Sequence, residues 1–290
     1  MAIDRFIPTI WSTQLLLELR KNLVYGQAAV INTDYQGEIS AAGDTVRIHN
    51  FGAVNVFDYL KNTDMTGPQT LTDAETTLTI DQAKAFNFQI DDIDRAQQTP
   101  KIMAAVMSDA AYRLADVLDQ FIAGHYVDAG ITLGSDATPV VPTKATAYEI
   151  LVDLGTELSE ANVPTAGRWV VIPPWFYGLL LKDDRFVATG SAQADAVLRN
   201  GIMGRAAGFD VYQSNNVPNN AGGAYKILAS TNVAWSMAQQ INGMEAYRPE
   251  KRFGDAVKGL HLYGAKVVRP NTLACLTADK TAAEEEEIEG

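Results

Sequence analysis

The chain of 290 residues has very little of the chemistry that metal and thiol sites require: it contains one cysteine and three histidines. A single thiol excludes an internal disulfide and a thiolate metal cluster, and Cys275 lies in an apolar stretch that predicts a buried, inert side chain. The histidines, His49, His125 and His261, stand far apart, with no second ligand at metal-binding spacing. We therefore predict structural roles for all three, no metal site and no cofactor.

Basic residues are also scarce, with 23 lysines and arginines against 35 aspartates and glutamates and a formal net charge of -12. This balance argues against a protein that binds nucleic acid by neutralising phosphates over its whole surface, so contact with DNA should be indirect. Long apolar runs are missing as well. The longest, residues 169–181, is too short to span a bilayer as a helix, and we see no signal peptide, so no membrane partner is predicted.

Common enzyme signatures are absent from the sequence. The glycines of GIMGRAAG, residues 201–208, lack the spacing and the lysine of a phosphate-binding loop. The acidic cluster Asp91, Asp92 and Asp94 lacks the glycine and distal glutamate of a calcium loop, so we interpret it as a solvated strand end. Paired carboxylates for glycoside hydrolysis stay open as an alternative, because 35 acidic residues offer many pairs. We predict no catalytic residue and no enzymatic activity.

The beginning of the chain is predicted to form an arm with one amphipathic helix. Its apolar stripe consists of Trp11, Leu15, Leu19 and Leu23, which recur at four-residue spacing. Residues 32–43 are polar and contain glycine, so they read as a connection. The arm could therefore reach away from the core.

Two alternating runs, residues 45–59 and 78–90, predict strands of about fifteen residues that form a long hairpin. At about 3.3 Å per residue this hairpin could extend on the order of 50 Å. Its tip, residues 60–75, is turn-rich and charged. Few compact domains can bury such a ribbon, so much of it should face water or a neighbouring subunit.

A long helix is predicted over residues 99–128, beginning with a threonine N-cap before Pro100 and keeping one apolar face for about seven turns. The remainder alternates helices and strands, which predicts a mixed α+β fold. Further helices are expected at residues 145–160, 174–181 and 192–199, and strands at residues 168–172, 209–213, 225–229, 234–237, 259–268 and 273–277. The chain ends in an acidic tail with five glutamates in its last seven residues.

This order of elements resembles the Hong Kong 97-type fold of tailed-bacteriophage major capsid proteins. Local stretches resemble that family too: IPTIWSTQLLLELRKNLVY, TDYQGEISAAGDTVRI, TLTIDQAKAFNFQIDDID, RWVVIPPWFYGLLL and GIMGRAAGFDVYQSNNVP. The resemblance implies an N-terminal arm at residues 1–42, an extended loop at 43–74, a peripheral domain at 75–144 with a spine helix at 99–128, an axial domain at 145–246, a return to the peripheral domain at 247–277 and an acidic tail at 278–290.

The resemblance implies a shell protein that assembles as hexamers and pentamers into an icosahedral phage head enclosing double-stranded DNA. Its expected partners are further copies of itself, a separate scaffolding protein, a portal protein and a decoration protein, and its expected locations are the virion and, during assembly, the host cytoplasm. Candidate inter-subunit contacts are Trp11, Leu15 and Leu19 in the arm and Phe57, Asp58, Tyr59, Lys61 and Asp64 in the loop. An encapsulin-like nanocompartment shell and a soluble hydrolase with paired carboxylates are the alternatives.

Overall fold

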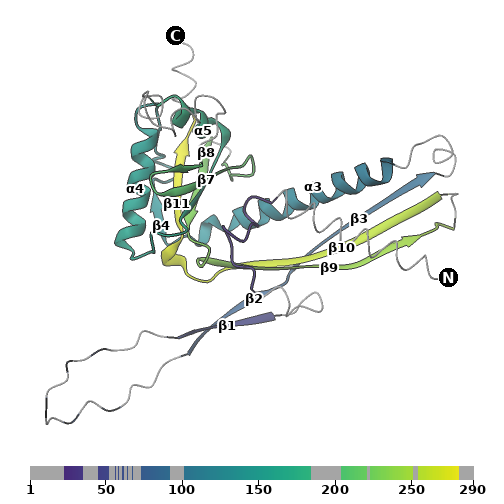
Figure 1. Cartoon of the computed structure of the whole chain (residues 1–290), viewed down its shortest axis with the longest axis horizontal. Coiled ribbons are helices and arrows are strands. Elements are labelled where there is room, and N and C mark those ends of the chain that lie inside the picture. Colours follow the sequence, from purple (N-terminus) through teal and green to yellow (C-terminus); the bar gives the residue numbers. More distant parts are fainter. Residues whose placement is uncertain are drawn as a thin grey trace.

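The computed structural model describes residues 23–34, 45–51, 73–91, 101–183, 204–220, 223–250 and 254–280, together with the single positions 56, 58, 61, 64 and 67. Within these residues the chain forms a two-stranded ribbon, a three-stranded sheet and a six-stranded sheet. Helices accompany the two larger sheets (Figure 1). The mixed α+β fold predicted from the sequence is confirmed.

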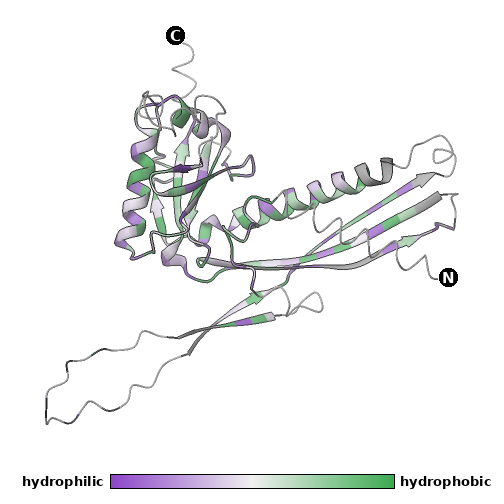
Figure 2. Ribbon diagram, viewed as in Figure 1, coloured by the Kyte–Doolittle hydropathy of each residue, from purple (hydrophilic) through white to green (hydrophobic). Residues whose placement is uncertain are grey.

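The six-stranded sheet forms the centre of a lobe. Its strands lie in the order β4 (Ile131–Leu133), β11 (Ala274–Asp279), β8 (Ala224–Ser230), β5 (Trp169–Ile172), β7 (Phe209–Gln213) and β6 (Arg205–Ala206). Every residue of β5 is buried, as expected for an apolar strand covered on both faces. The helices of the lobe are α4 (Ala147–Glu160) and α5 (Pro174–Leu181). In Figure 2 hydrophobic residues gather along α4 and the strands beside it.

The end of α4 is held by a buried arginine. Arg168 donates hydrogen bonds to the carbonyl oxygens of Gly155 at 2.9 Å, Val163 at 2.7 Å and Pro164 at 3.0 Å, and to the Ser159 hydroxyl at 3.1 Å. A planar guanidinium has five N–H donors and can therefore bind several oxygen atoms around it at once. The loop between α4 and β5 is therefore tied to the helix by one side chain.

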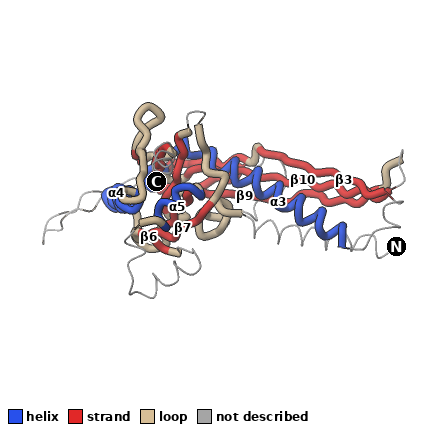
Figure 3. The backbone as a smooth tube through the Cα atoms, turned by 90° about the horizontal axis from the view of Figure 1, so that it is seen from above, coloured by secondary structure: helices blue, strands red, loops and turns tan. Residues whose placement is uncertain are grey.

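The three-stranded sheet is long, with strands in the order β3 (Gln82–Asp91), β10 (Gly254–Val267) and β9 (Trp235–Tyr247). Helix α3 (Lys101–Ala123) lies along one face of it (Figure 1 and Figure 3). The rings of Phe121 on α3 and Tyr263 on β10 meet edge to face, 5.3 Å apart. The predicted long helix is confirmed, although its last turns, Gly124–Asp128, form a tighter 3-10 helix and its predicted start lies outside the described residues.

The ribbon pairs β1 (Thr45–Phe51) with β2 (Asp73–Thr79) in antiparallel register. It packs on the face of the three-stranded sheet opposite α3, in a small core made by Val46, Ile48, Leu78, Ile80, Ala238 and Leu262. The approach is close, because a Cβ at Gly264 would overlap the carbonyl oxygen of Thr79. Glycine is therefore required where the ribbon crosses β10.

One part of the predicted hairpin is wrong. The second run does not stay in the hairpin to Ile90, because the chain turns away after Ile80 and β3 pairs with β10 instead. The physical reason is that apolar residues continue at every second position across the point where the chain changes its partner strand. These residues are Leu78, Ile80, Phe86 and Phe88. Periodicity reports which side chains are buried and not which strand lies beside them.

Strand pairing does not follow the predicted domain boundaries everywhere. Strand β9 begins at Trp235, inside the segment predicted as axial, yet it belongs to the three-stranded sheet. Strand β4, predicted with the peripheral domain, and strand β11, predicted with it up to residue 277, belong to the six-stranded sheet. The domain boundaries themselves stay a prediction. The predicted helix at residues 192–199 and most of the tail lie outside the described residues.

Candidate functional site

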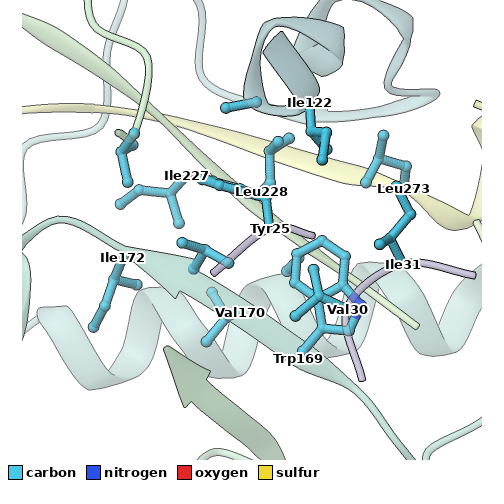
Figure 4. Close-up of a cluster of buried hydrophobic side chains, with 14 of the residues drawn as sticks. Tyr25, Val30, Ile31, Ile122, Trp169, Val170, Ile172, Ile227, Leu228 and Leu273 are labelled. Atoms are coloured by element: carbon cyan, nitrogen blue, oxygen red, sulfur yellow. The ribbon is translucent and has the colours of Figure 1, made fainter. Parts of the chain in front are cut away.

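The described end of the arm, residues 23–34, is named here the arm anchor. It lies where the C-terminal end of α3 approaches β9 and the lobe (Figure 1). Leu23, Tyr25, Val30 and Ile31 are at most 1% exposed and belong to the main hydrophobic core. Figure 4 shows Tyr25, Val30 and Ile31 gathered with Trp169 and other core residues of the lobe. A segment that precedes every described strand is thus part of the central packing.

One end of the arm anchor is held by a buried carboxylate on α3. Asp119 is 2% exposed and accepts hydrogen bonds from the backbone N–H groups of Val24 at 2.7 Å, Tyr25 at 3.1 Å and Gly26 at 3.2 Å. Burial raises the pKa of Asp119 to about 6, and the three N–H donors oppose that rise. The carboxylate is therefore costly to bury, and both of its oxygens accept hydrogen bonds from the arm anchor.

The other end of the arm anchor is held by Trp235. Its indole N–H donates to the carbonyl oxygen of Val30 at 2.7 Å, and the backbone of Asn32 bonds to Trp235 at 3.2 Å and to Met237 at 2.9 Å. The Trp235 ring stacks on Trp169 of β5 at 5.4 Å. The anchor is therefore fixed to the three-stranded sheet, and the same tryptophan joins that sheet to the lobe.

A second polar contact ties α3 to the lobe one turn before Asp119. The amide of Asn216 donates to one oxygen of Asp116 at 2.8 Å, and Gln120 donates to the other at 3.0 Å. Two consecutive turns of α3 thus bind the lobe and the arm. This geometry fixes both relative to the long helix.

The candidate loop contacts are only partly described. Asp58, Lys61 and Asp64 are exposed, and the neighbouring Val56 is 95% exposed. Phe57 and Tyr59 lie outside the described residues.

The three arm candidates, Trp11, Leu15 and Leu19, also lie outside the described residues. Nothing in the structure tests the inter-subunit roles of the eight candidates, which stay predictions.

Large hydrophobic side chains are exposed on both faces of the extended part of the molecule. Tyr112 and Val117 on α3 are 58% and 38% exposed, and Tyr247 and Leu260 on the sheet are each 37% exposed. Such residues need no explanation singly, but a series along an elongated body is typical of a surface that neighbours cover.

Two histidines and the cysteine, His261, His125 and Cys275, are engaged in the fold. His261 is 1% exposed, its Nε2 lies 3.3 Å from the Gln239 side-chain oxygen, and burial lowers its pKa to about 4. Cys275 is buried, as predicted, which raises its pKa to about 11. His125 lies 3.3 Å from Asp128. Nowhere in the described ranges do three or more metal-ligating side chains come together, and no described helix is long and apolar enough to cross a membrane.

Known proteins share this architecture. The family described as "Phage capsid protein" matches residues 73–276. Among solved structures, one from Mycobacterium phage Che8 is similar at 30% sequence identity and a TM-score of 0.69, covering 87% of this chain and 89% of that chain. The capsid of cyanophage P-SCSP1u is similar at 20% identity and a TM-score of 0.66, covering 83% and 84%.

A virus-like particle from Pyrococcus furiosus shares the fold at 12% identity and a TM-score of 0.54, with 91% of this chain and 96% of that chain covered. Comparison with curated proteins gave no match. The long helix on a three-stranded sheet, the projecting ribbon and the mixed lobe define the Hong Kong 97-type fold of capsid shells. The chain belongs to the phage capsid protein family, and the resemblance predicted from the sequence is confirmed.

Proposed function

We propose that this capsid shell protein is the major capsid protein of a tailed phage, which assembles as hexamers and pentamers into an icosahedral head around double-stranded DNA. The observation that carries the proposal is the ribbon, which leaves the body from the sheet face opposite α3 (Figure 1), together with the exposure of the described loop positions 56, 58, 61, 64 and 67. A subunit acting alone has no use for such a projection. A neighbour supplies the surface that it needs.

In this proposal the stability of the shell is the sum of many modest contacts between subunits. Each subunit in a closed shell touches several neighbours, so releasing one subunit requires all of its contacts to break together. In this proposal the loop residues Phe57, Asp58, Tyr59, Lys61 and Asp64 lie across an adjacent subunit. Their mixture of aromatic rings and charges of both signs supports specific docking.

The charge of the chain supports indirect contact with DNA. A net charge of -12 is compatible with an inner wall that encloses a polyanion without binding it tightly. A scaffolding protein, a portal protein and a decoration protein are the further partners in this proposal. The mature location is the virion, and assembly takes place in the host cytoplasm.

Membership of the capsid family supports a structural and non-enzymatic role. The hydrolase alternative finds no support at Asp116 and Asp119, because both carboxylates are engaged by donors within the fold. The nanocompartment alternative shares this fold and differs in its cargo. Nuclease-protected DNA in particles from infected cells supports the phage head, whereas particles that hold only protein would contradict it.

The role of the loop is tested by replacing residues 56–70 with a short glycine-serine turn, which leaves β1 and β2 intact. We expect a folded subunit with an unchanged urea unfolding midpoint that no longer closes shells in electron micrographs. The matched control is the full-length chain prepared in parallel. Normal shells from the shortened chain would show that the loop is not an assembly contact.

A further inference from the structure

The lobe stands at one end of the extended part of the molecule (Figure 1 and Figure 3). This part consists of α3, the three-stranded sheet and the ribbon and is called here the body. Three connections between the lobe and the body lie within the described residues: 124–130, 231–234 and 268–273. The N–H of Gly130 donates to the carbonyl oxygen of Pro270 at 2.9 Å, and the N–H of Val268 donates to that of Ala234 at 2.9 Å. The three connections therefore run close together and form a waist.

Apolar packing continues across the waist. Ala111 and Leu114 of α3 share one hydrophobic core with Trp169 and Phe176 of the lobe. The gain from apolar burial follows the area removed from water and is not directional, so it holds the two parts together more firmly than it fixes their angle. A hydrogen bond restricts both distance and direction, so a polar contact away from the waist constrains the angle more sharply.

Such a contact joins the lobe to α3. The side-chain amide of Asn216 donates to Asp116 at 2.8 Å, and Asp116 lies seven residues before Ala123, the last residue of α3. At about 1.5 Å per residue, the bond lies about 10 Å along the helix from the waist. A pivot of the lobe by about 10° would move the two groups roughly 2 Å apart, which is enough to break the bond.

The lobe presents Asn216 from a loop that is fixed at both ends. The N–H of Ser214 donates to the carbonyl oxygen of Ile172 in β5 at 3.0 Å, and the Ser214 hydroxyl accepts the N–H of Asn216 at 3.1 Å. On the other side, the carbonyl oxygen of Pro218 accepts the N–H of Lys226 in β8 at 2.8 Å. The position of Asn216 therefore follows the position of the lobe sheet.

The acceptor on α3 is oriented as well. Gln120, one turn further along the helix, donates to the second oxygen of Asp116 at 3.0 Å. With one oxygen held by its own helix, the carboxylate turns the other towards the lobe. Both partners of the bond are thus positioned before they meet.

We propose that the hydrogen bond between Asn216 and Asp116 is a strut that holds the lobe at one angle to the body and thereby sets the curvature of the shell. In a closed assembly the rotation from one subunit to the next decides where the assembly closes, so a small change in the shape of the subunit changes the diameter. This inference rests on the proposed shell function and adds two positioning residues to it.

The angle itself is tested with spin labels in the full chain. Val152→Cys on α4 and Tyr112→Cys on α3 provide exposed attachment sites, whereas native Cys275 is buried and should stay unlabelled. Labelled chain diluted with unlabelled chain should give one narrow distance distribution by double electron–electron resonance. With the further change Asn216→Ala, the population at other distances should rise about tenfold, because a hydrogen bond to a charged group is lost.

An exchange of donor and acceptor separates the strut from general damage to the fold. Asn216→Asp alone places two carboxylates against each other and should broaden the distribution further. Adding Asp116→Asn should restore the narrow distribution, since the new amide can donate to the lobe and still accept from Gln120. The matched control is Arg113→Ala, which removes an exposed pair with Asp109 at 2.9 Å on the same helix and should change nothing.

The diameters of shells from the same variants test the link to curvature. Electron micrographs of Asn216→Ala should show a wider spread of diameters than the parent chain and Arg113→Ala, and the exchanged pair should return to the parent diameter. An unchanged label distance in both Asn216 variants would overturn the strut, and a changed distance with unchanged diameters would overturn its role in curvature. If the parent chain forms no shells, the proposed function fails, and the label distances still decide whether the bond holds the lobe.

Discussion

Asp119 should stabilise the folded chain mainly by accepting hydrogen bonds and not through its negative charge. Replacing it with alanine leaves the N–H groups of Val24, Tyr25 and Gly26 without their partner. Each buried unpaired donor costs about 1–3 kcal/mol, but the anchor can partly undock into water and the costly buried charge is removed. We therefore expect Asp119→Ala to lower the free energy of unfolding by about 2 kcal/mol.

Asp119→Asn separates the two contributions. Asparagine keeps one acceptor oxygen for the N–H groups of Tyr25 and Gly26 and leaves the N–H of Val24 without an acceptor, but it avoids the desolvation of a charge, which raises the pKa of the carboxyl to about 6. At neutral pH we expect this variant to lie within about 1 kcal/mol of the wild type. Urea unfolding followed by tryptophan fluorescence measures both variants, because Trp235 packs against the anchor. Hydrogen exchange at residues 24–26 should rise about thirtyfold in Asp119→Ala.

The pH dependence gives the sign of the charge effect. The pKa of Asp119 in the folded chain, about 6, lies above its ordinary value of 3.8, so the folded chain holds this proton more tightly than the unfolded chain. Its stabilising contribution is complete below the ordinary value and is lost as the pH rises through about 6. The wild type should therefore lose stability relative to Asp119→Asn over this range. An asparagine variant as unstable as the alanine variant at every pH would refute the reasoning.

Other substitutions test the remaining contacts. Arg168→Ala should lower the free energy of unfolding by about 2–4 kcal/mol, measured in urea, because four hydrogen bonds of a buried side chain are lost. Gly264→Ala should cost more than about 2 kcal/mol, since the ribbon must move, whereas Gly178→Ala in α5, where a Cβ meets nothing, should be tolerated. Burial lowers the pKa of His261 from 6.5 to about 4. The contribution of its neutral form to the free energy of unfolding is therefore present above pH 6.5 and lost as the pH falls towards 4. His261→Gln should flatten the measured stability over that range.

Helices and strands with a clear hydrophobic pattern could be predicted from the sequence. Helix α3 keeps one apolar face over many turns, and β5 is a short, wholly apolar run beside a proline-started helix. Strands β4 and β6 have three and two residues, too few to show any period. The end of β9 was missed because Gln239, Gln240 and Asn242 interrupt the apolar pattern of the sequence, beyond the fully buried start of the strand at residues 235–238.

The arm anchor could not be predicted, because its partners are far apart in the sequence. Asp119 and Val24 are separated by 95 residues. Asp119 binds backbone N–H groups, which nearly every residue has, so the sequence does not mark its partners. One signal was available: an aspartate stands next to Leu118 within the buried stripe of α3. A buried carboxylate requires donors, so its position could have prompted a search for them.

Closed shell formation is the central claim, and electron microscopy of the purified full chain tests it most directly, alone and with a scaffolding protein encoded beside it. The account predicts closed polyhedral particles under at least one of these conditions. A small species of uniform size under both conditions would contradict it.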